Sequence, residues 1–160
     1  VDALCEADWS GNAAATVNEV LARFAADAGP SELLAQRTIV DRCFAHDRME
    51  DVVAALAADG SDFARQTAAT LAAMSPTSLK LTLAQMRRGK GIDLDAALVM
   101  EYRLTQSVLK HHDFYEGIRA QLIDKDRNPK WDPPTLAGVD DAEIAGYFEA
   151  PPHGDLTFPD

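Results

Sequence analysis

A basic, proline-containing stretch, residues 125–131, holds the side chains best suited to contact a ligand. It reads Lys-Asp-Arg-Asn-Pro-Lys-Trp. Lysine and arginine around a rigid turn can contact a phosphate group, and tryptophan can stack on a flat ring. The alternative, which is favoured on general grounds, is a solvated helix end with Trp131 as a packing anchor. A second basic cluster, Arg-Arg-Gly-Lys at residues 87–90, is open to the same two interpretations.

The histidines do not predict a metal site. His111 and His112 lie next to Asp113, and a group of this kind can bind a metal ion. Adjacent side chains on a helix diverge by about 100°, however, so the two rings do not readily hold one ion. A histidine near the end of a helix is explained by its favourable interaction with the helix dipole. The other two histidines, His46 and His153, stand alone in the sequence.

Paired carboxylates are frequent, but their positions predict helix capping. General acid–base catalysis needs two carboxyl groups in different and partly buried surroundings. The pairs all fall at expected helix ends or in loops: Asp93/Asp95, Asp124/Asp126 and Asp140/Asp141. Glu101 differs, because it lies on the apolar stripe of a long expected helix. An ion pair is favoured there over catalysis, with three candidate partners: Lys80, Arg103 and Arg119.

The serines do not predict a nucleophile either. Ser75 and Ser78 have no histidine nearby in the sequence, and Ser75 is explained as a helix cap. We therefore predict no catalytic residue in this chain.

Apolar residues recur at helical spacing along most of the chain, and no segment shows the sustained alternation of a strand. A first helix is expected over about residues 13–28, with Val17, Val20, Leu21 and Phe24 on one face. Residues that can cap helix starts precede the apolar runs: Asn12, Ser31, Asp47, Ser61, Ser75, Asp93, Asp113 and Asp140. We predict an all-α fold of about seven or eight helices.

The helix before the basic stretch is expected to begin at Asp113 and to bury Phe114, Ile118 and Leu122. It is expected to end at Asn128-Pro129, because the residue before a proline avoids the helical region. We expect the helical portion to occupy residues 1–132. Residues 133–160 should then form a linker, one short helix and an extended tail from Pro151 onward.

Composition excludes some classes of function. The chain has 160 residues, enough for one domain, and a formal net charge of −11. That charge argues against a nucleic-acid surface, because binding to phosphates along a nucleic acid needs a basic face. Cys5 and Cys43 are expected to be free and buried thiols.

The sequence has neither a run of about 18 apolar residues nor a charged segment followed by a short apolar one. We therefore expect no membrane span, no secretory signal and a cytoplasmic location. The opening residues through Gly11 are expected to be an internal loop of a larger protein. Leu79 and Leu81 point in different directions on one expected helix, so exposed apolar surface and a missing partner are expected as well.

Three strings in the order given carry a resemblance to a known family. They are SPTSLK at residues 75–80, VMEYRL at 99–104 and DFYEGIRAQLIDKDRNPKW at 113–131. Residues 39–44, 52–63 and 142–148 fit the same register. Over about residues 39–148 the chain resembles the C-terminal half of the 3-hydroxyisobutyryl-CoA hydrolases, which belong to the enoyl-CoA hydratase/isomerase (crotonase) superfamily. The resemblance implies the C-terminal helical portion of a crotonase-like fold.

The resemblance also implies an activity that the composition could not indicate. Members hydrolyse a hydroxyacyl-CoA thioester in valine breakdown, with backbone N–H groups that stabilise the thioester oxygen and a nearby carboxylate. These groups belong to the N-terminal half, which has no matching segment here, so no catalytic residue is carried over. Coenzyme A enters as part of the substrate, and no separate cofactor is expected.

For the helical portion, the resemblance implies a cover over the acyl-CoA pocket and contacts between subunits of a homo-oligomer. The expected partners are therefore the acyl-CoA substrate, the N-terminal half of the same enzyme and a second subunit. Basic residues near the last helix often approach the phosphates of coenzyme A in this superfamily. The matching positions are Lys125, Arg127 and Lys130.

Two other functions stay open. The same helices could belong to an enoyl-CoA hydratase or isomerase, which only the carboxylates of the N-terminal half would distinguish. They could also form a stand-alone helical interaction module. An in-frame start codon directly upstream of Val1 would favour the module.

Overall fold

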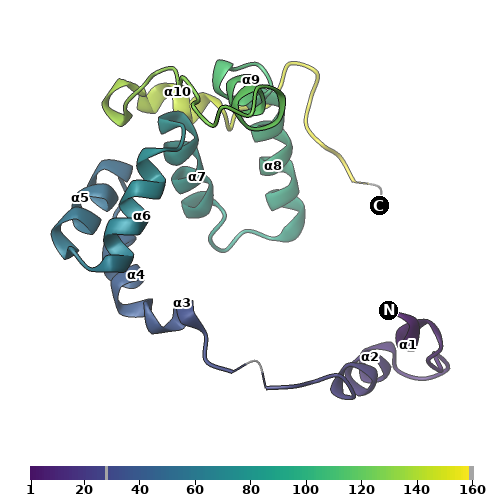
Figure 1. Cartoon of the computed structure of the whole chain (residues 1–160). Coiled ribbons are helices and arrows are strands. Elements are labelled where there is room, and N and C mark those ends of the chain that lie inside the picture. Colours follow the sequence, from purple (N-terminus) through teal and green to yellow (C-terminus); the bar gives the residue numbers. More distant parts are fainter. Residues whose placement is uncertain (28, 159–160) are drawn as a thin grey trace. The chain divides into compact units, whose positions relative to one another are not determined.

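The computed structural model describes residues 1–27 and 29–158, and this part of the chain is helical, as predicted (Figure 1). It contains ten α-helices, one π-helix and one 3-10 helix, and no strand within the described residues. The number exceeds the seven or eight expected because several helices are a single turn long. No helix among the described residues is both long enough and apolar enough to cross a bilayer. The chain divides into two compact units, Val1–Arg37 and the residues from Thr38 onward.

The first unit contains three short helices, α1 (Asp2–Cys5), α2 (Ala13–Ala22) and α3 (Glu32–Ala35). The side chain of Asn12 caps α2 and that of Ser31 caps α3, as predicted. The opening residues are not entirely a loop, since α1 forms there and Trp9 donates its indole N–H to the Leu4 carbonyl at 3.2 Å.

Helix α2 ends earlier than predicted. Its last turn tightens into bonds between residues three apart, with the Phe24 N–H donating to the Leu21 carbonyl at 3.0 Å. Ala28, the predicted last residue of this helix, lies outside the described residues.

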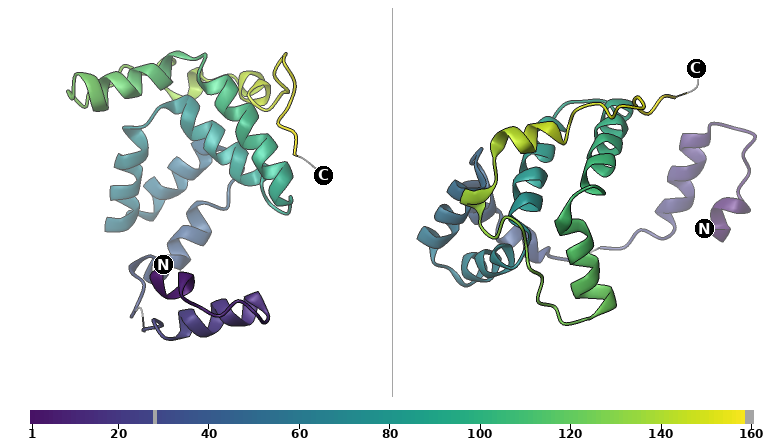
Figure 2. Two further views of the ribbon diagram at one scale, coloured as in Figure 1. Left: turned by 90° about the vertical axis from the view of Figure 1, so that its right-hand side faces the viewer. Right: turned by 90° about the horizontal axis from the view of Figure 1, so that it is seen from above.

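The second unit holds the remaining helices. They are α4 (Arg37–Cys43, which begins at the boundary), α5 (Met49–Asp59), α6 (Asp62–Ala72), α7 (Pro76–Arg88), α8 (Leu94–Val108), α9 (His112–Ile118), the π-helix η1 (Arg119–Ile123), the 3-10 helix η2 (Leu136–Gly138) and α10 (Asp141–Gly146). Figure 2 shows that α10 lies against α7 when the unit is seen from further sides, and the two helices are in contact.

Two hydrophobic clusters stabilise this unit, and α7 contributes to both. The α5–α6 cluster consists of Cys43, Met49, Val52, Leu56 and Ala64. The α7–α8 cluster consists of Leu81, Leu104, Val139, Ile144, Tyr147 and Phe148. Leu79 packs on the first cluster and Leu81 belongs to the second, so the prediction that these two side chains point in different directions is confirmed.

Most predicted helix caps in this unit are confirmed, and two are wrong. Ser61, Ser75, Asp93 and Asp140 each accept a hydrogen bond from a backbone N–H of the first turn. Asp47 does not cap α5, whose N-cap is Arg48. Its carboxylate lies 3.4 Å from the guanidinium of Arg87 on another helix, which the local sequence does not reveal.

Asp113 does not cap a helix either, because α9 begins one residue before it. The Asp113 carboxylate instead accepts hydrogen bonds from the Ser75 hydroxyl and from the backbone N–H of Asp132. A side chain that forms bonds with two other segments is not free to cap its own.

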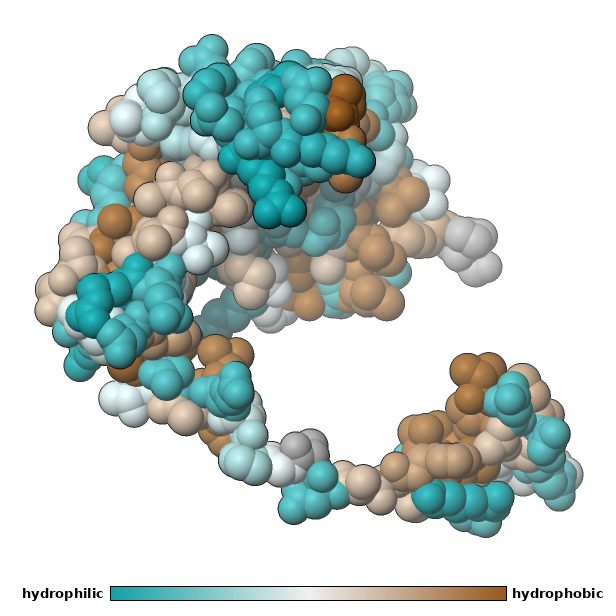
Figure 3. Space-filling view, viewed as in Figure 1, coloured by the Kyte–Doolittle hydropathy of each residue, from teal (hydrophilic) through white to brown (hydrophobic). Residues whose placement is uncertain are grey.

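Hydrophobic side chains are exposed on the surface, as expected, and Figure 3 shows them in brown. Met86, Leu94, Leu122 and Ile123 are each about 70% exposed in the second unit. The expectation that Leu122 and Phe114 are buried is wrong, because both are exposed. Both cysteines are free, as expected. Cys43 is buried, but the expectation that Cys5 is buried is wrong, because it is exposed.

The division between residues 1–132 and 133–160 stays a prediction. Beyond residue 132, Val139, Ile144, Tyr147 and Phe148 pack in the same cluster as Leu81. The described part of the tail, residues 151–158, contains no helix. It is held by Asp155, which accepts two hydrogen bonds from the guanidinium of Arg103. Pro159 and Asp160 lie outside the described residues.

Neighbouring valines on α5 provide a test of this packing. Val52 is fully buried in the α5–α6 cluster, whereas Val53 is only partly buried. We expect Val52→Ala to reduce the free energy of unfolding by about 2 kcal/mol, since it removes two buried methyl groups and leaves a cavity. Val53→Ala makes the same chemical change and should cost clearly less. Urea unfolding of the full-length protein measures both, and equal losses would contradict the assignment of the cluster.

Candidate functional site

The basic stretch follows the π-helix η1, which extends α9. Helix α9 continues without a break into η1, where the Asp124 N–H donates to the Arg119 carbonyl, five residues back, at 2.8 Å. Single π-turns of this kind are frequent at functional sites. The helical structure stops at Ile123, before the predicted end at Asn128-Pro129, because a π-turn widens the helix and the next residues leave it.

Two residues of the stretch have an unusual backbone conformation. Lys125 has φ 56° and Arg127 has φ 53°, in the left-handed region that disfavours side chains with a Cβ. Such a residue costs about 1–3 kcal/mol unless its surroundings impose the conformation. We call residues 124–131 the basic turn, and the contacts that impose its shape come from its two ends.

At its start, the basic turn is held by Arg119. The Arg119 guanidinium donates two hydrogen bonds of 2.8 Å to Glu116, one of 2.7 Å to Asp124 and one of 2.8 Å to Asp126. A further, longer bond of 3.3 Å reaches the Asn128 carbonyl. We call Arg119 with its three carboxylates the Arg119 clasp. The planar guanidinium suits this role because it offers five donors in fixed directions.

The clasp changes the pKa of Glu116, Asp126 and Arg119. Hydrogen bonds from Arg119, together with the backbone N–H of Lys130, lower the pKa of Glu116 to about 2. The pKa of Asp126 is also lowered by its hydrogen bond from Arg119 and by the Asn128 N–H. The hydrogen bonds to Glu116, Asp126 and Asp124 raise the pKa of Arg119 above its ordinary value. Glu116, Asp126 and Arg119 are therefore charged near neutral pH.

At its end, the basic turn is anchored by Trp131. The indole N–H donates to the Ala73 carbonyl at 3.0 Å, just beyond the end of α6, and the ring packs against Gly117 of α9. The Lys130 N–H donates to Glu116 at 2.6 Å, so the clasp also reaches this end. Trp131 therefore acts as a packing anchor, which was the alternative to stacking on a ligand ring.

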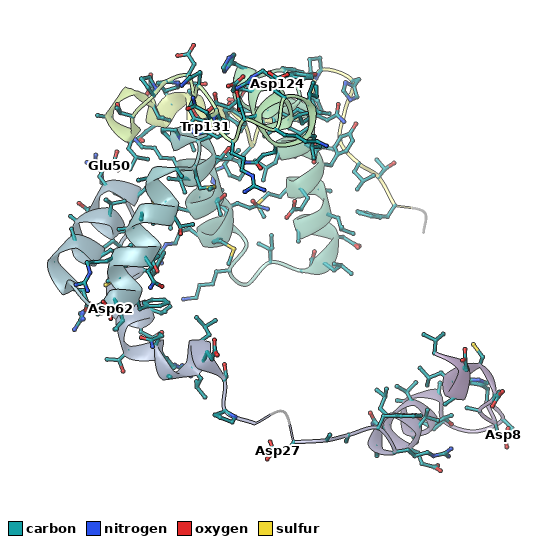
Figure 4. The ribbon with its side chains drawn as sticks, in the orientation of Figure 1. Asp8, Asp27, Glu50, Asp62, Asp124 and Trp131 are labelled. Atoms are coloured by element: carbon teal, nitrogen blue, oxygen red, sulfur yellow. The ribbon has the colours of Figure 1, made fainter. Side chains whose placement is uncertain are left out.

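The structure brings the three predicted contact residues onto one short turn, and Figure 4 labels Asp124 and Trp131 at its two ends. The Lys130 ammonium donates to the Asn128 side chain at 2.9 Å. Lys125 and Arg127 are exposed, and neither side chain has a partner within residues 1–27 and 29–158. Two cations are thus available to an anion at the surface.

The two arginines of the other basic cluster form contacts within the fold. Arg87 donates hydrogen bonds to the carbonyls of Phe44 at 3.3 Å and His46 at 2.6 Å. The Arg88 guanidinium lies 3.8 Å from the centre of the Phe148 ring. Both arginines therefore stabilise packing between segments, which leaves the basic turn as the stronger candidate for an anion.

His111, His112 and Asp113 line a polar cavity of about 330 Å³ together with Tyr147. His111 stacks on the Tyr147 ring with 4.5 Å between centroids, and His112 lies 3.1 Å from Asp113. Burial raises the pKa of Tyr147 to about 12. Within the described part of the chain, no three side chains of His, Cys, Asp or Glu are placed to hold a metal ion.

The ion pair predicted for Glu101 is wrong, and Lys80, one of its three predicted partners, binds other carboxylates. Glu101 accepts a hydrogen bond from Gln85, not from any of the three basic residues proposed for it. The Lys80 side chain, only 10% exposed, forms ion pairs with Glu50 at 2.9 Å and Asp141 at 3.1 Å. Burial alone would lower the pKa of Lys80, but the hydrogen bonds to these two carboxylates outweigh it and raise the pKa.

Sequence reasoning also missed the Arg119 clasp. The sequence pattern indicates Arg119 only as a partner for Glu101, and Asp124 with Asp126 only as an acidic pair at a helix end. Two signals were present. Glu116 and Arg119 have the three-residue spacing of a helical ion pair, and aspartates alternate with cations in Asp-Lys-Asp-Arg at residues 124–127.

Comparison with known proteins identifies the family. The profile of the family described as enoyl-CoA hydratase/isomerase matches residues 1–148. The chain belongs to this family. A mitochondrial 3-hydroxyisobutyryl-CoA hydrolase from Danio rerio is 48% identical over 127 residues, which cover 79% of this chain and 33% of the relative. The Homo sapiens protein of the same name is 42% identical over 119 residues, 74% of this chain and 31% of the relative. The chain therefore spans about a third of the length of these curated relatives.

Solved structures of the family share the helical fold. A carnitinyl-CoA dehydratase from Mycobacterium thermoresistibile aligns with a TM-score of 0.81 and 41% identity, over 91% of this chain and 42% of the other. An enoyl-CoA hydratase from Rhodobacter sphaeroides 2.4.1 aligns with a TM-score of 0.78 and 30% identity, over 91% and 45%. The predicted helical portion of a crotonase-like fold is confirmed.

The expectation of a cytoplasmic location is wrong. It is contradicted by the hydrolase relatives, which are named as mitochondrial proteins. The expectation rested on the lack of an apolar leader, whereas a mitochondrial transit peptide is amphipathic and rich in arginine. A search for apolar segments could therefore not decide between these compartments.

The Arg119 clasp should make stability depend on pH. A carboxyl group whose pKa is lowered on folding contributes stability above its unfolded pKa and loses it as the pH falls through the folded pKa. For Glu116 these values are 4.5 and about 2. We expect Glu116→Gln to be less stable than the wild type above pH 4.5, and the difference to shrink between pH 4.5 and about 2. Denaturant unfolding of the full-length protein over this range measures the difference.

Glu149→Gln is the matched control. Glu149 is an exposed carboxylate without a side-chain partner in the part of the chain that the structure describes. Its variant should follow the wild type throughout the pH range. A constant difference between the wild type and Glu116→Gln would show that the charge of Glu116 does not hold the basic turn.

Proposed function

We propose that this chain is the helical C-terminal portion of an acyl-CoA thioester hydrolase that acts on 3-hydroxyisobutyryl-CoA. The identity of 48% with a hydrolase of that name, over 127 residues, carries the proposal. The strings that suggested the resemblance include the residues of the Arg119 clasp and the basic turn, so the likeness includes the candidate site itself.

In this proposal the helices cover the acyl-CoA pocket and support assembly of the enzyme. The exposed apolar side chains of α7, α8 and η1, among them Met86, Leu94 and Leu122, suit a surface that another part of the protein covers. The catalytic groups are supplied by the N-terminal half, and a second subunit of a homo-oligomer is a further partner. Coenzyme A takes part as a portion of the substrate.

The basic turn contacts the phosphates of coenzyme A in this proposal. Lys125 and Arg127 are exposed cations in a chain whose net charge is −11, so an anion is attracted to this turn and repelled by most of the remaining surface. Lys130 belongs to the same turn, although its ammonium group also donates to Asn128.

An enoyl-CoA hydratase or isomerase is the second candidate. The solved structures that align with the chain bear the names of a dehydratase and a hydratase, at 41% and 30% identity. The two candidates share these helices, so the difference lies in the chemistry of the N-terminal half.

Assay of the full-length gene product separates these candidates. We expect release of the free thiol of coenzyme A from 3-hydroxyisobutyryl-CoA, and no addition of water to an enoyl-CoA. Hydration of the enoyl-CoA without thioester cleavage would favour the second candidate. The polypeptide of residues 1–160 alone should release no thiol, and clear turnover by it would place catalytic groups in this chain.

Charge reversal tests the role of the basic turn. In the full-length enzyme, Lys125→Glu combined with Arg127→Glu should raise the KM for the CoA thioester about tenfold, because charge-assisted hydrogen bonds are lost and like charges meet. Steady-state kinetics measures this change. Reversal of Lys110, an exposed lysine beyond α8, serves as the control. An unchanged KM in the double variant would mean that the basic turn is an ordinary solvated surface that does not contact the phosphates of coenzyme A.

A further inference from the structure

The alternation of charge in the basic turn raises a physical question. Asp124 and Asp126 each stand directly before a cation, Lys125 and Arg127. Oppositely charged neighbours on a flexible turn attract one another, and paired cations would offer little to an incoming anion. The structure shows no such pairing among the described residues. Both aspartates bind the guanidinium of Arg119, at 2.7 Å and 2.8 Å.

The geometry of the clasp explains why the aspartates bind Arg119. The Arg119 side chain is only 31% exposed and is held in place by two hydrogen bonds to Glu116, whose side chain is 10% exposed. A guanidinium that is already oriented binds further carboxylates with little additional loss of conformational freedom. Lys125 and Arg127 are exposed, so each would have to give up side-chain freedom to pair with an aspartate.

The backbone of the basic turn fits the same separation of charges. The Asn128 N–H donates to Asp126 at 2.9 Å, and the Arg127 N–H donates to the Ala120 carbonyl at 3.1 Å. These bonds accompany the left-handed conformation of Lys125 and Arg127. The turn is thus held in one shape, in which the carboxylates are occupied and the cations are not.

We propose that Arg119 is a positioning residue that binds Asp124 and Asp126 and so keeps Lys125 and Arg127 available to the phosphates of coenzyme A. This inference rests on the proposed function of the basic turn in contacting coenzyme A, and it extends it. Arg119 itself touches no substrate. Without its charge, the two aspartates pair with their neighbours and the turn loses its attraction for phosphate.

The test uses the full-length protein and measures binding of free coenzyme A by calorimetry, with pantetheine, which lacks the phosphates, as the second probe. Arg119→Met should weaken binding of coenzyme A about fivefold, since two ordinary surface ion pairs then compete with the ligand. Binding of pantetheine should not change. An equal loss for both probes would overturn the proposal, because it would indicate general damage to the fold.

Rescue distinguishes positioning from simple structural support. Arg119→Met combined with Asp124→Asn and Asp126→Asn removes the competing carboxylates, and binding of coenzyme A should return to within about twofold of the wild type. Binding that stays as weak as in Arg119→Met alone would overturn the proposal.

A second variant keeps the test decisive if Arg119→Met does not fold. With Arg119 intact, Asp124→Asn combined with Asp126→Asn keeps a side-chain oxygen at each position to accept the hydrogen bonds from Arg119 and from the Asn128 N–H, so the shape of the turn is kept. Because the charges that are removed were already paired with Arg119, the affinity for coenzyme A should stay within about twofold. A gain of about fivefold would mean that the aspartates had been neutralising the cations directly, and it would refute the role of Arg119.

Binding of coenzyme A does not depend on turnover, so the two proposals can fail separately. If the full-length protein binds coenzyme A but cleaves no thioester, the proposed hydrolase activity is refuted. The role of Arg119 is then still tested by the binding assays on the Arg119 and aspartate variants. If the wild type hydrolyses the thioester and the Arg119→Met variant binds coenzyme A as tightly as the wild type, only the inference about Arg119 is refuted.

Discussion

Helix α7 is buried on two sides, and the architecture of the second unit depends on this constraint. Leu79 and Leu83 pack toward the α5–α6 cluster, and Leu81 packs into the α7–α8 cluster. Between them, Lys80 extends to Glu50 on α5 and Asp141 on α10. A lysine with so little exposure must have partners for its charge, so the ion pairs restrict how these three helices can be arranged. The helix thus joins the two clusters through both apolar and ionic contacts.

The start of α7 also positions the basic turn. Ser75 caps this helix and donates to Asp113, and Asp113 in turn accepts from the N–H of Asp132, directly after the turn. Trp131 donates to the carbonyl of Ala73, two residues before the cap. The end of the basic turn is therefore anchored to the junction of α6 and α7, while Arg119 holds its start. A turn fixed at both ends can keep left-handed residues that would otherwise be costly.

A division of roles between neighbouring charges follows from this anchoring. The sequence Asp-Lys-Asp-Arg has no net charge over four residues, yet the structure assigns its acidic and basic members to different tasks. The aspartates satisfy an oriented guanidinium inside the turn, and the cations remain at the surface. Local composition alone would describe this stretch as neutral. In the role proposed for this turn, its attraction for an anion depends on the placement of Arg119, one π-turn earlier in the chain.

The amino-acid sequence by itself determined the class of the fold, most of its helix starts and its family. Helical periodicity and capping depend on residues within one or two turns, so Asn12, Ser31, Ser61, Ser75, Asp93 and Asp140 could be recognised as caps from their neighbours alone. The strings around the basic turn were distinctive enough to indicate the family that the comparisons confirm.

Tertiary structure decided the partners of the charged groups, because those partners are distant in the sequence or depend on an irregular turn. Asp47 and Asp113 were expected to cap helices, but Asp47 pairs with Arg87 and Asp113 accepts a hydrogen bond from Ser75. The π-turn at Arg119, the exposure of Leu122 and the ion pairs of Lys80 have no local signature that the periodicity could reveal. Hydrogen bonds to charged groups form wherever folding brings donor and acceptor within about 3 Å, and only the folded chain sets those distances.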